Sequence, residues 1–137
     1  MDTDSGHYTR IGTITRTLKK YLAKSIPFLD WSFEITGAAI PSKPSGTVTA
    51  DVVTFDNPYK YGDAVTIEYT IYLIAPLPSS ARLDEWAMTV RSVLADNPDL
   101  GGAVTDSNVS KIIFGAAPGI HGASGACMIR YEIEADF

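Results

Sequence analysis

The sequence predicts an α+β domain, with a mostly antiparallel sheet of four or five strands and two main helices packed on one face. Two segments carry apolar residues at the three- and four-residue spacing of an amphipathic helix. Other segments alternate apolar with polar residues, as half-buried strands do. The elements follow in the order helix, strand, hairpin, helix, hairpin, and a chain of 137 residues corresponds to a single domain, 1–137.

The first helix is expected from Tyr8 to Ile26, where the apolar spacing is helical and Pro27 ends the pattern. Residues 1–7 are polar, so we expect them to form a flexible tail. Basic side chains gather on this helix, namely Arg10, Arg16, Lys19, Lys20 and Lys24. The cluster is either a solvated helix face or a docking surface for an acidic partner subunit or a phosphate surface.

The central helix of the chain is expected over Ser80–Ala95, with Leu83, Trp86, Val90 and Leu94 among the residues of its apolar stripe. Ser79 and Ser80 predict its start, because a serine hydroxyl at an N-cap accepts a hydrogen bond from a free backbone amide. Asp96-Asn97-Pro98 predicts its end, because proline removes a backbone donor and turns the residue before it out of the helical region.

The expected strands share β-branched and aromatic residues in short runs bounded by turn residues. The run Ala64–Ala75 is the clearest, because Val65, Ile67, Tyr69, Ile71 and Leu73 all face one way. In the last strand Cys127, Ile129, Tyr131 and Ile133 share a face, and an antiparallel hairpin is the simplest pairing of the last two strands. The other runs are Trp31–Thr36, Thr47–Phe55 with a bulge at Val52-Val53, Val109–Phe114 and Ala126–Glu134. No structure is assigned to the loop Gly37–Gly46.

Composition bounds the classes of function. The net charge is −5, from 11 basic and 16 acidic residues, which gives no overall basic footprint for nucleic acid. The one cysteine can form no internal disulfide, so a cytoplasm is the expected site of folding. Residues 1–4 lack the pattern of a signal peptide, and the longest apolar run, Ile71–Pro76, is too short for a membrane helix.

Residue types that carry chemistry are few and poorly placed for it. His7 and His121 have no second ligand at metal spacing, and Ser124 misses the nucleophile-elbow spacing by one residue. Cys127 is expected to be a buried small apolar residue. Glu132 and Glu134 share a strand face beside Arg130, either as an acid–base pair or, as we expect, as an outward face of alternating charge. We therefore expect no catalytic, cofactor-binding or metal-binding residues, and no enzyme.

The second half of the chain resembles the tail terminator (tail completion) proteins of long-tailed bacteriophages, a family of small α+β proteins. The resemblance rests on the apolar stripe of the central helix, on the run from Asp96 through Asp99-Leu100-Gly101-Gly102-Ala103-Val104, on the strand Val109–Phe114, and on the closing alternating strand. It implies a structural protein that forms a hexameric ring on the head-proximal end of the tail tube, stops its polymerisation and joins it to the head and neck.

The resemblance also implies the partners: further copies of the chain, the tail tube protein and a head–tail connector or neck protein. DNA would pass through the ring lumen without sequence-specific binding, and no membrane is involved. The expected location is the virion tail, after synthesis in the host cytoplasm. The residues expected at the assembly interface are Arg16, Lys19, Lys20, Ile120, His121, Glu132 and Glu134.

Two alternatives remain open at this point. The chain is another neck or tail-tube component, or it is a small enzyme or ligand-binding domain. In the latter the site would lie between the sheet and the loop Gly115–Gly125, with His121, Ser124, Arg130 and Glu132 as its polar groups. In the assembly hypotheses the same loop orders against a partner, because its glycines make ordering costly without one.

Overall fold

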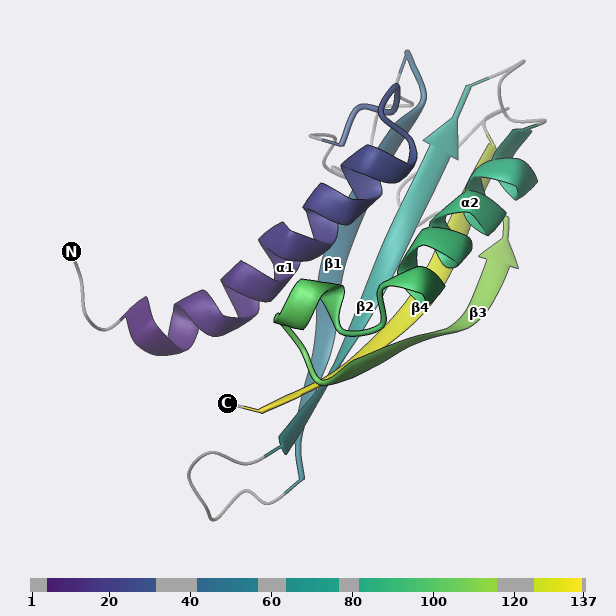
Figure 1. Ribbon diagram of the computed structural model, residues 1–137. Helices are drawn as coiled ribbons and strands as arrows, with labels where there is room; N and C mark the ends of the chain where they lie inside the picture. The colour runs from purple at the N-terminus through teal and green to yellow at the C-terminus, as the bar shows by residue number, and fades with distance from the viewer. Residues whose placement is uncertain (1–4, 32–41, 57–63, 77–81, 116–124, 137) are drawn as a thin grey trace.

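The computed structural model describes residues 5–31, 42–56, 64–76, 82–115 and 125–136. Two helices lie on one face of a four-stranded sheet, which confirms the α+β fold (Figure 1). The strand order is β1-β2-β4-β3, and every neighbouring pair is antiparallel. The elements are α1 (Ser5–Ser25), β1 (Ser45–Phe55), β2 (Ala64–Ala75), α2 (Leu83–Asp96), a short 3₁₀ helix η2 (Leu100–Gly102), β3 (Asp106–Phe114) and β4 (Gly125–Asp136).

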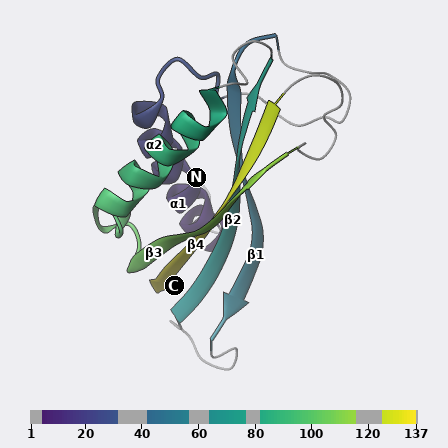
Figure 2. The ribbon, with the colours of Figure 1, turned by 90° about the vertical axis from the view of Figure 1, so that its right-hand side faces the viewer.

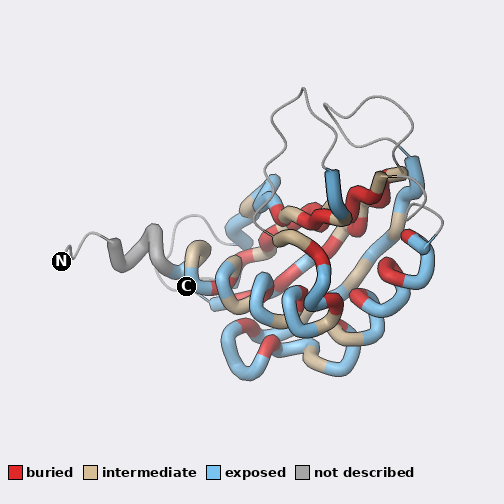
Figure 3. The backbone as a smooth tube through the Cα atoms, turned by 90° about the horizontal axis from the view of Figure 1, so that it is seen from above, coloured by how far each residue is buried: buried red, intermediate tan, exposed pale blue. Residues whose placement is uncertain are grey.

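The core lies between the sheet and the two helices, and no helix of the described residues lies on the opposite face of the sheet (Figures 2 and 3). The two central strands, β2 and β4, pair along their whole length and turn alternate residues into this core. The predicted alternation is confirmed, since these residues are all buried: Val65, Ile67, Tyr69, Ile71, Leu73, Cys127, Ile129, Tyr131 and Ile133.

Helix α1 packs through a stripe with a four-residue period. Ile14, Leu18 and Leu22 are buried, and the Thr15 hydroxyl lies 2.8 Å from the Tyr69 hydroxyl of β2. The helix begins at Ser5 and not at Tyr8, so it includes residues 5–7, which precede the predicted start.

Helix α2 begins later than predicted. Its N-cap is Arg82, which makes no side-chain capping bond, and Ser79 and Ser80 lie outside the described residues. The serine cap is therefore a wrong prediction: the helix starts where its apolar stripe starts, and the Asp84 carboxylate accepts from the Glu85 amide in the first turn. The predicted end at Asp96 is confirmed, as is burial of the stripe Leu83, Trp86, Ala87, Val90 and Leu94.

The turn from α2 to β3 is built by Asp99-Leu100-Gly101-Gly102-Ala103-Val104, one of the runs on which the resemblance to tail terminators rests. The Asp99 carboxylate accepts a hydrogen bond from the Gly101 amide at 3.2 Å, and Gly101 has φ of +70°, a conformation that glycine adopts without steric cost. Leu100 also has positive φ, +49°, but its side chain is buried against the core, and that burial offsets the strain. The motif therefore has a structural role in this chain.

Strand β1 departs from the prediction at two points. It begins at Ser45, so Gly46 belongs to the strand and not to the preceding loop. Its register shifts between Ala50 and Val52, which places the bulge at Asp51, one residue before the predicted position. Of the predicted strand Trp31–Thr36, only Trp31 lies in the described part of the chain, in a turn. Residues 32–36 lie outside the described part. Just before them, Asp30 forms a single parallel bridge with Ser45.

Gly46 is in close contact with the indole ring of Trp31. A Cβ added at this position would lie 2.5 Å from a ring carbon, and the ring is held in place by a 3.2 Å hydrogen bond from its Nε1 to the carbonyl of Ile26. We expect Gly46→Ala to lower the free energy of unfolding by about 1 to 3 kcal/mol through overpacking. Chemical denaturation measures the change.

The matched control is Gly12→Ala in α1. There the nearest side-chain atom is 4.0 Å from the added Cβ, and alanine favours a helix by about 0.5 to 1 kcal/mol over glycine. The two identical chemical changes should therefore act in opposite directions. A Gly46→Ala protein as stable as the wild type would contradict the contact with Trp31.

Candidate functional site

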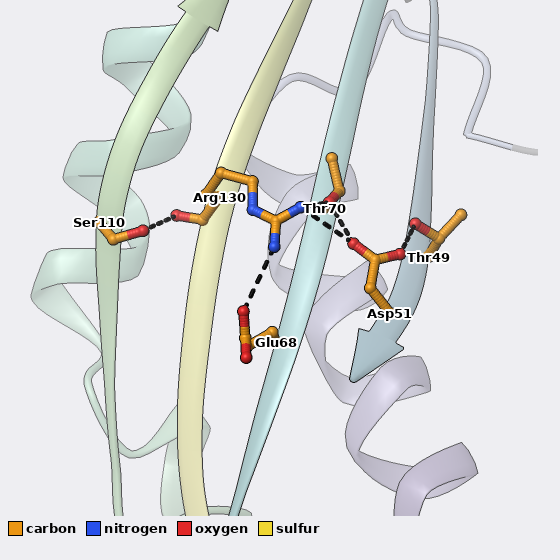
Figure 4. A network of polar contacts seen from close by, with 6 residues as sticks. All are labelled: Thr49, Asp51, Glu68, Thr70, Ser110 and Arg130. Carbon is orange, nitrogen blue, oxygen red and sulfur yellow. Dashed lines mark hydrogen bonds and ion pairs between the residues drawn. The ribbon is translucent and has the colours of Figure 1, made fainter. Parts of the chain in front are cut away.

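A polar network centred on Arg130 lies on the face of the sheet turned away from the helices (Figure 4). The Arg130 guanidinium donates to the Thr70 hydroxyl at 2.8 Å and contacts the carboxylates of Asp51 and Glu68, each at 3.3 Å. The Thr70 hydroxyl also bonds to Asp51. The Thr49 hydroxyl donates to the second Asp51 oxygen at 2.8 Å. The network thus joins β1, β2 and β4.

The strand order brings these residues together. Thr70 in β2 lies directly opposite Arg130 in β4 on one side and Thr49 in β1 on the other. The bulge at Asp51 adds a residue to β1 at this level, and its carboxylate reaches the open face. Strand β3 also bulges here, between Val109 and Lys111, where the Ser110 hydroxyl donates to the Arg130 carbonyl.

The network acts as a tie between strands. Both carboxylate partners of Arg130 are already engaged, so the network holds the three strands together. We expect Arg130→Met, which keeps the aliphatic stem, to lower the free energy of unfolding by about 1 to 2 kcal/mol. The reason is that Asp51, Glu68 and Thr70 lose the charged hydrogen-bond donor that they share, while water can still reach the two carboxylates.

The control for this prediction is Lys111→Met, which removes a cation from the residue opposite Arg130 on β3. Lys111 is exposed and has no carboxylate partner in the described part of the chain, so its replacement should change stability by less than about 0.5 kcal/mol. Urea denaturation of both variants checks the difference. Equal effects would show that the network contributes nothing beyond surface charge.

The open face is acidic where the start of β3 lies beside the end of β4. Asp106, Glu132, Glu134 and Asp136 are exposed there, and none pairs with a cation among the described residues. Asp106 lies directly opposite Glu134, and Glu132 lies directly opposite Glu68. Like charges at directly opposed positions destabilise a sheet. Glu132 and Glu134 thus form the predicted outward face, but the charge beside them is mostly of one sign.

Helix α1 carries the opposite charge. Its sequence contains five cations and no acidic residue. Arg16, Lys19, Lys20 and Lys24 are exposed and have no carboxylate partner within the described ranges, whereas Arg10 donates to the main-chain carbonyl of Asp136. The predicted interface residues therefore fall into two groups on opposite sides of the molecule, the cations on α1 and the carboxylates on β4. Ile120 and His121 lie outside the described residues.

A cavity of about 200 Å³ lies between the end of α2, the following turn and β3. Tyr131 lines it, and the Tyr131 hydroxyl is buried and has no hydrogen-bond partner. Burial raises the pKa of Tyr131 to about 12; the nearby Ser107 lowers it in part, while Tyr69 and Asp106 raise it further. The lining residues are Arg91, Leu94, Ala95, Pro98, Ser107, Asn108, Val109 and Tyr131.

This cavity is not where the ligand-binding alternative expected its site. Arg130 and Glu132 are on the open face of the sheet, on the opposite side from the Tyr131 side chain, so they do not line it. His121 and Ser124 lie outside the described residues. The pocket had no signal in the sequence, because its lining comes from a helix end, a turn and two strands with no shared motif.

Cys127 is fully buried, as predicted for a small apolar residue, and burial raises its pKa to about 11. His7 lies in α1. Within residues 5–31, 42–56, 64–76, 82–115 and 125–136, no three His, Cys, Asp or Glu side chains gather as they would around a metal ion. Neither described α-helix is long and apolar enough to cross a membrane.

Comparison with known proteins gave no match: no protein-family model fits this sequence, and no curated protein is significantly similar to it.

Proposed function

We propose that the chain is a structural virion protein of the tail terminator type. In this proposal a hexameric ring of copies caps the head-proximal end of the tail tube, stops its polymerisation and joins it to the head and neck. The partners are the tail tube protein and a head–tail connector or neck protein, and DNA passes through the lumen without sequence-specific binding. The protein acts by binding and not by catalysis.

One observation carries the proposal: in the described part of the chain both helices lie on the same face of the sheet. The other face is exposed along β3 and the end of β4, whereas Ile74 and Ala126 at its opposite end are buried. Among the described residues the outer edges of β1 and β3 pair with no further strand apart from the single Asp30–Ser45 bridge. Strand edges and open faces invite contacts with other chains. A closed ring of identical copies covers such surfaces by repeating one heterologous contact. The resemblance of the second half of the chain to tail terminators supports the same reading.

The test is the mass and shape of the purified full-length protein. Light scattering should give six times the chain mass of 14.8 kDa, and negative-stain electron microscopy should show rings that bind one end of isolated tail tubes. A matched sample of tail tubes without the protein should continue to grow in length. A protein that stays monomeric at every concentration, and does not bind tube ends, would contradict the proposal.

A second candidate function, binding of a small ligand, is favoured by the cavity beside Tyr131. The buried Tyr131 hydroxyl has no hydrogen-bond partner, and Arg91 at the cavity offers a positive charge. Thermal-shift measurements with a metabolite set would test it. A melting temperature raised by one compound in the wild type, and not in Tyr131→Phe, would support a ligand site.

A further inference from the structure

We infer that neighbouring copies join head to tail, with α1 of one copy lying along β4 of the next. The contacting residues are a basic stripe, defined as Arg16, Lys20 and Lys24, and an acidic stripe, defined as Glu132, Glu134 and Asp136. The inference rests on the ring of the proposed function and specifies the contact that builds it.

The two stripes match in spacing. The basic stripe has a four-residue period, so its members follow each other along the helix at roughly 6 Å. The acidic stripe has a two-residue period on one face of a strand, which gives steps of roughly 7 Å. A lysine or arginine side chain is long enough to absorb a difference of roughly 1 Å per step. Three cations on a helix can therefore meet three carboxylates on a strand at the same time.

Neither stripe forms an ion pair with any other described residue of the chain. Among the described residues the cations of the basic stripe have no carboxylate partner, and the carboxylates of the acidic stripe have no cationic partner. The acidic stripe is also under repulsion, because Glu132 faces Glu68 and Glu134 faces Asp106 across the sheet. Arg130 offsets the charge of Glu68 but reaches none of the stripe's carboxylates. A second copy would supply the missing cations.

The placement of the stripes decides the kind of symmetry. α1 packs on one face of the sheet through Ile14, Leu18 and Leu22, so its exposed cations point away from the sheet. The acidic stripe lies on the opposite face, because the residues between its members, Ile133 and Ala135, are buried in the core on the helix side. A two-fold dimer would need both stripes of one copy to touch the same neighbour, which opposite faces do not allow. Each copy therefore uses its helix on one neighbour and its sheet on another, which is a heterologous contact, and in the ring of the proposed function the rotation between neighbours closes it.

The basic stripe alone would also suit a nucleic acid backbone, since phosphate attracts any row of lysines and arginines. That reading explains nothing about the acidic stripe, whose repulsion would remain. A second copy of the chain accounts for both surfaces at once.

Charge-reversal variants test the contact. The first variant is Lys20→Glu with Lys24→Glu, and the second is Glu132→Lys with Glu134→Lys. Each should weaken assembly by roughly a hundredfold or more, because like charges then face each other at every contact. Light scattering and native mass spectrometry give the mass, and circular dichroism checks that each variant is folded.

Mixing the two charge-reversal variants provides the decisive experiment. In an equal mixture the acidic helix of the first variant meets the basic sheet of the second, and the unchanged basic helix of the second meets the unchanged acidic sheet of the first. Rings should form again, with the two variants alternating. A single chain that carries all four substitutions should also assemble by itself.

The matched control is Lys43→Glu with Arg82→Glu, which changes the net charge by the same amount at exposed positions outside both stripes and outside the cavity. It should form rings like the wild type. The Glu132→Lys, Glu134→Lys variant gives a further readout: its monomer should melt at a higher temperature than that of the wild type, because each new lysine faces a carboxylate across the sheet.

The outcomes separate the contact from the ring. Wild-type rings that survive either charge reversal would overturn this contact while leaving the tail terminator proposal in place. The same holds if the first variant loses only binding to duplex DNA and keeps its rings. A wild type that forms no ring at any concentration would overturn the proposed function, and the contact with it.

Discussion

Replacement of Trp86 by alanine is expected to lower the free energy of unfolding by about 3 to 5 kcal/mol. The indole is only 5% exposed and lies on the buried stripe of α2, so its removal loses apolar burial and leaves a cavity between α2 and its neighbours. The ring also contacts Phe28 edge-on, with centroids 5.3 Å apart. Against a total stability of about 5 to 15 kcal/mol for a domain, this is a large fraction.

The measurement is chemical denaturation, supported by a melting temperature that falls by roughly 10 to 20 °C. Met88→Ala is the matched control, because Met88 is on the same helix but 53% exposed, and it should change stability by less than about 1 kcal/mol. Trp86→Phe should cost less than Trp86→Ala, since it keeps much of the volume and removes an indole N–H that has no hydrogen-bond partner. A melting temperature unchanged by Trp86→Ala would contradict the packing of α2.

The elements with a strong period could be predicted from the sequence, but only some of their ends could. The bounds of β2, Ala64–Ala75, match the prediction because its alternation runs without interruption between turn residues. The start of α2 was misplaced because two serines after a proline have the chemistry of a cap, while the helix begins with its first buried residue, Leu83. The bulge in β1 was placed one residue late, because a run of β-branched residues hides which one leaves the ladder.

The Arg130 network illustrates what local sequence patterns cannot reveal. Asp51 and Arg130 are 79 residues apart and meet only because β2 lies between β1 and β4. Strand order depends on which hairpins pair with each other, and alternation within a strand contains no information about that. A useful signal did exist: Thr70 is a polar residue in the middle of the most apolar strand, and a buried hydroxyl requires a partner.

The separation of the cations on α1 from the carboxylates on β3 and β4 could be predicted only in part from the sequence. The cations of α1 form a cluster in the sequence, so they were found directly. The acidic end of the open face combines residues from β3 and β4, and Asp106 and Asp136 join Glu132 and Glu134 only through the antiparallel register of the sheet. Pairing in space, and not proximity in the chain, creates the like-charge contacts.

The free energy of unfolding should fall more steeply at alkaline pH than the surface charges alone would cause. Burial raises the pKa of Cys127 from 9.0 to about 11 and that of Tyr131 from 10.0 to about 12, and it also raises the pKa of Tyr69. In each case the unfolded chain ionises first, so the folded state holds more protons in that pH window. Stability is therefore fully present below about pH 9 and is lost as the pH rises towards 12, by roughly 2 to 3 kcal/mol for each of Cys127 and Tyr131.

The measurement is the free energy of unfolding by urea at a series of pH values from neutral to alkaline. The combined variant Cys127→Ala with Tyr131→Phe removes two of the buried acids and should flatten the slope above pH 9. Its stability at neutral pH should change by only about 1 to 2 kcal/mol, because the lost thiol packing is partly offset by removal of a buried hydroxyl without a partner. If the slope of the variant equals that of the wild type, neither side chain is protected from ionisation in the folded state, and the packing of β4 against the helices must be looser than described.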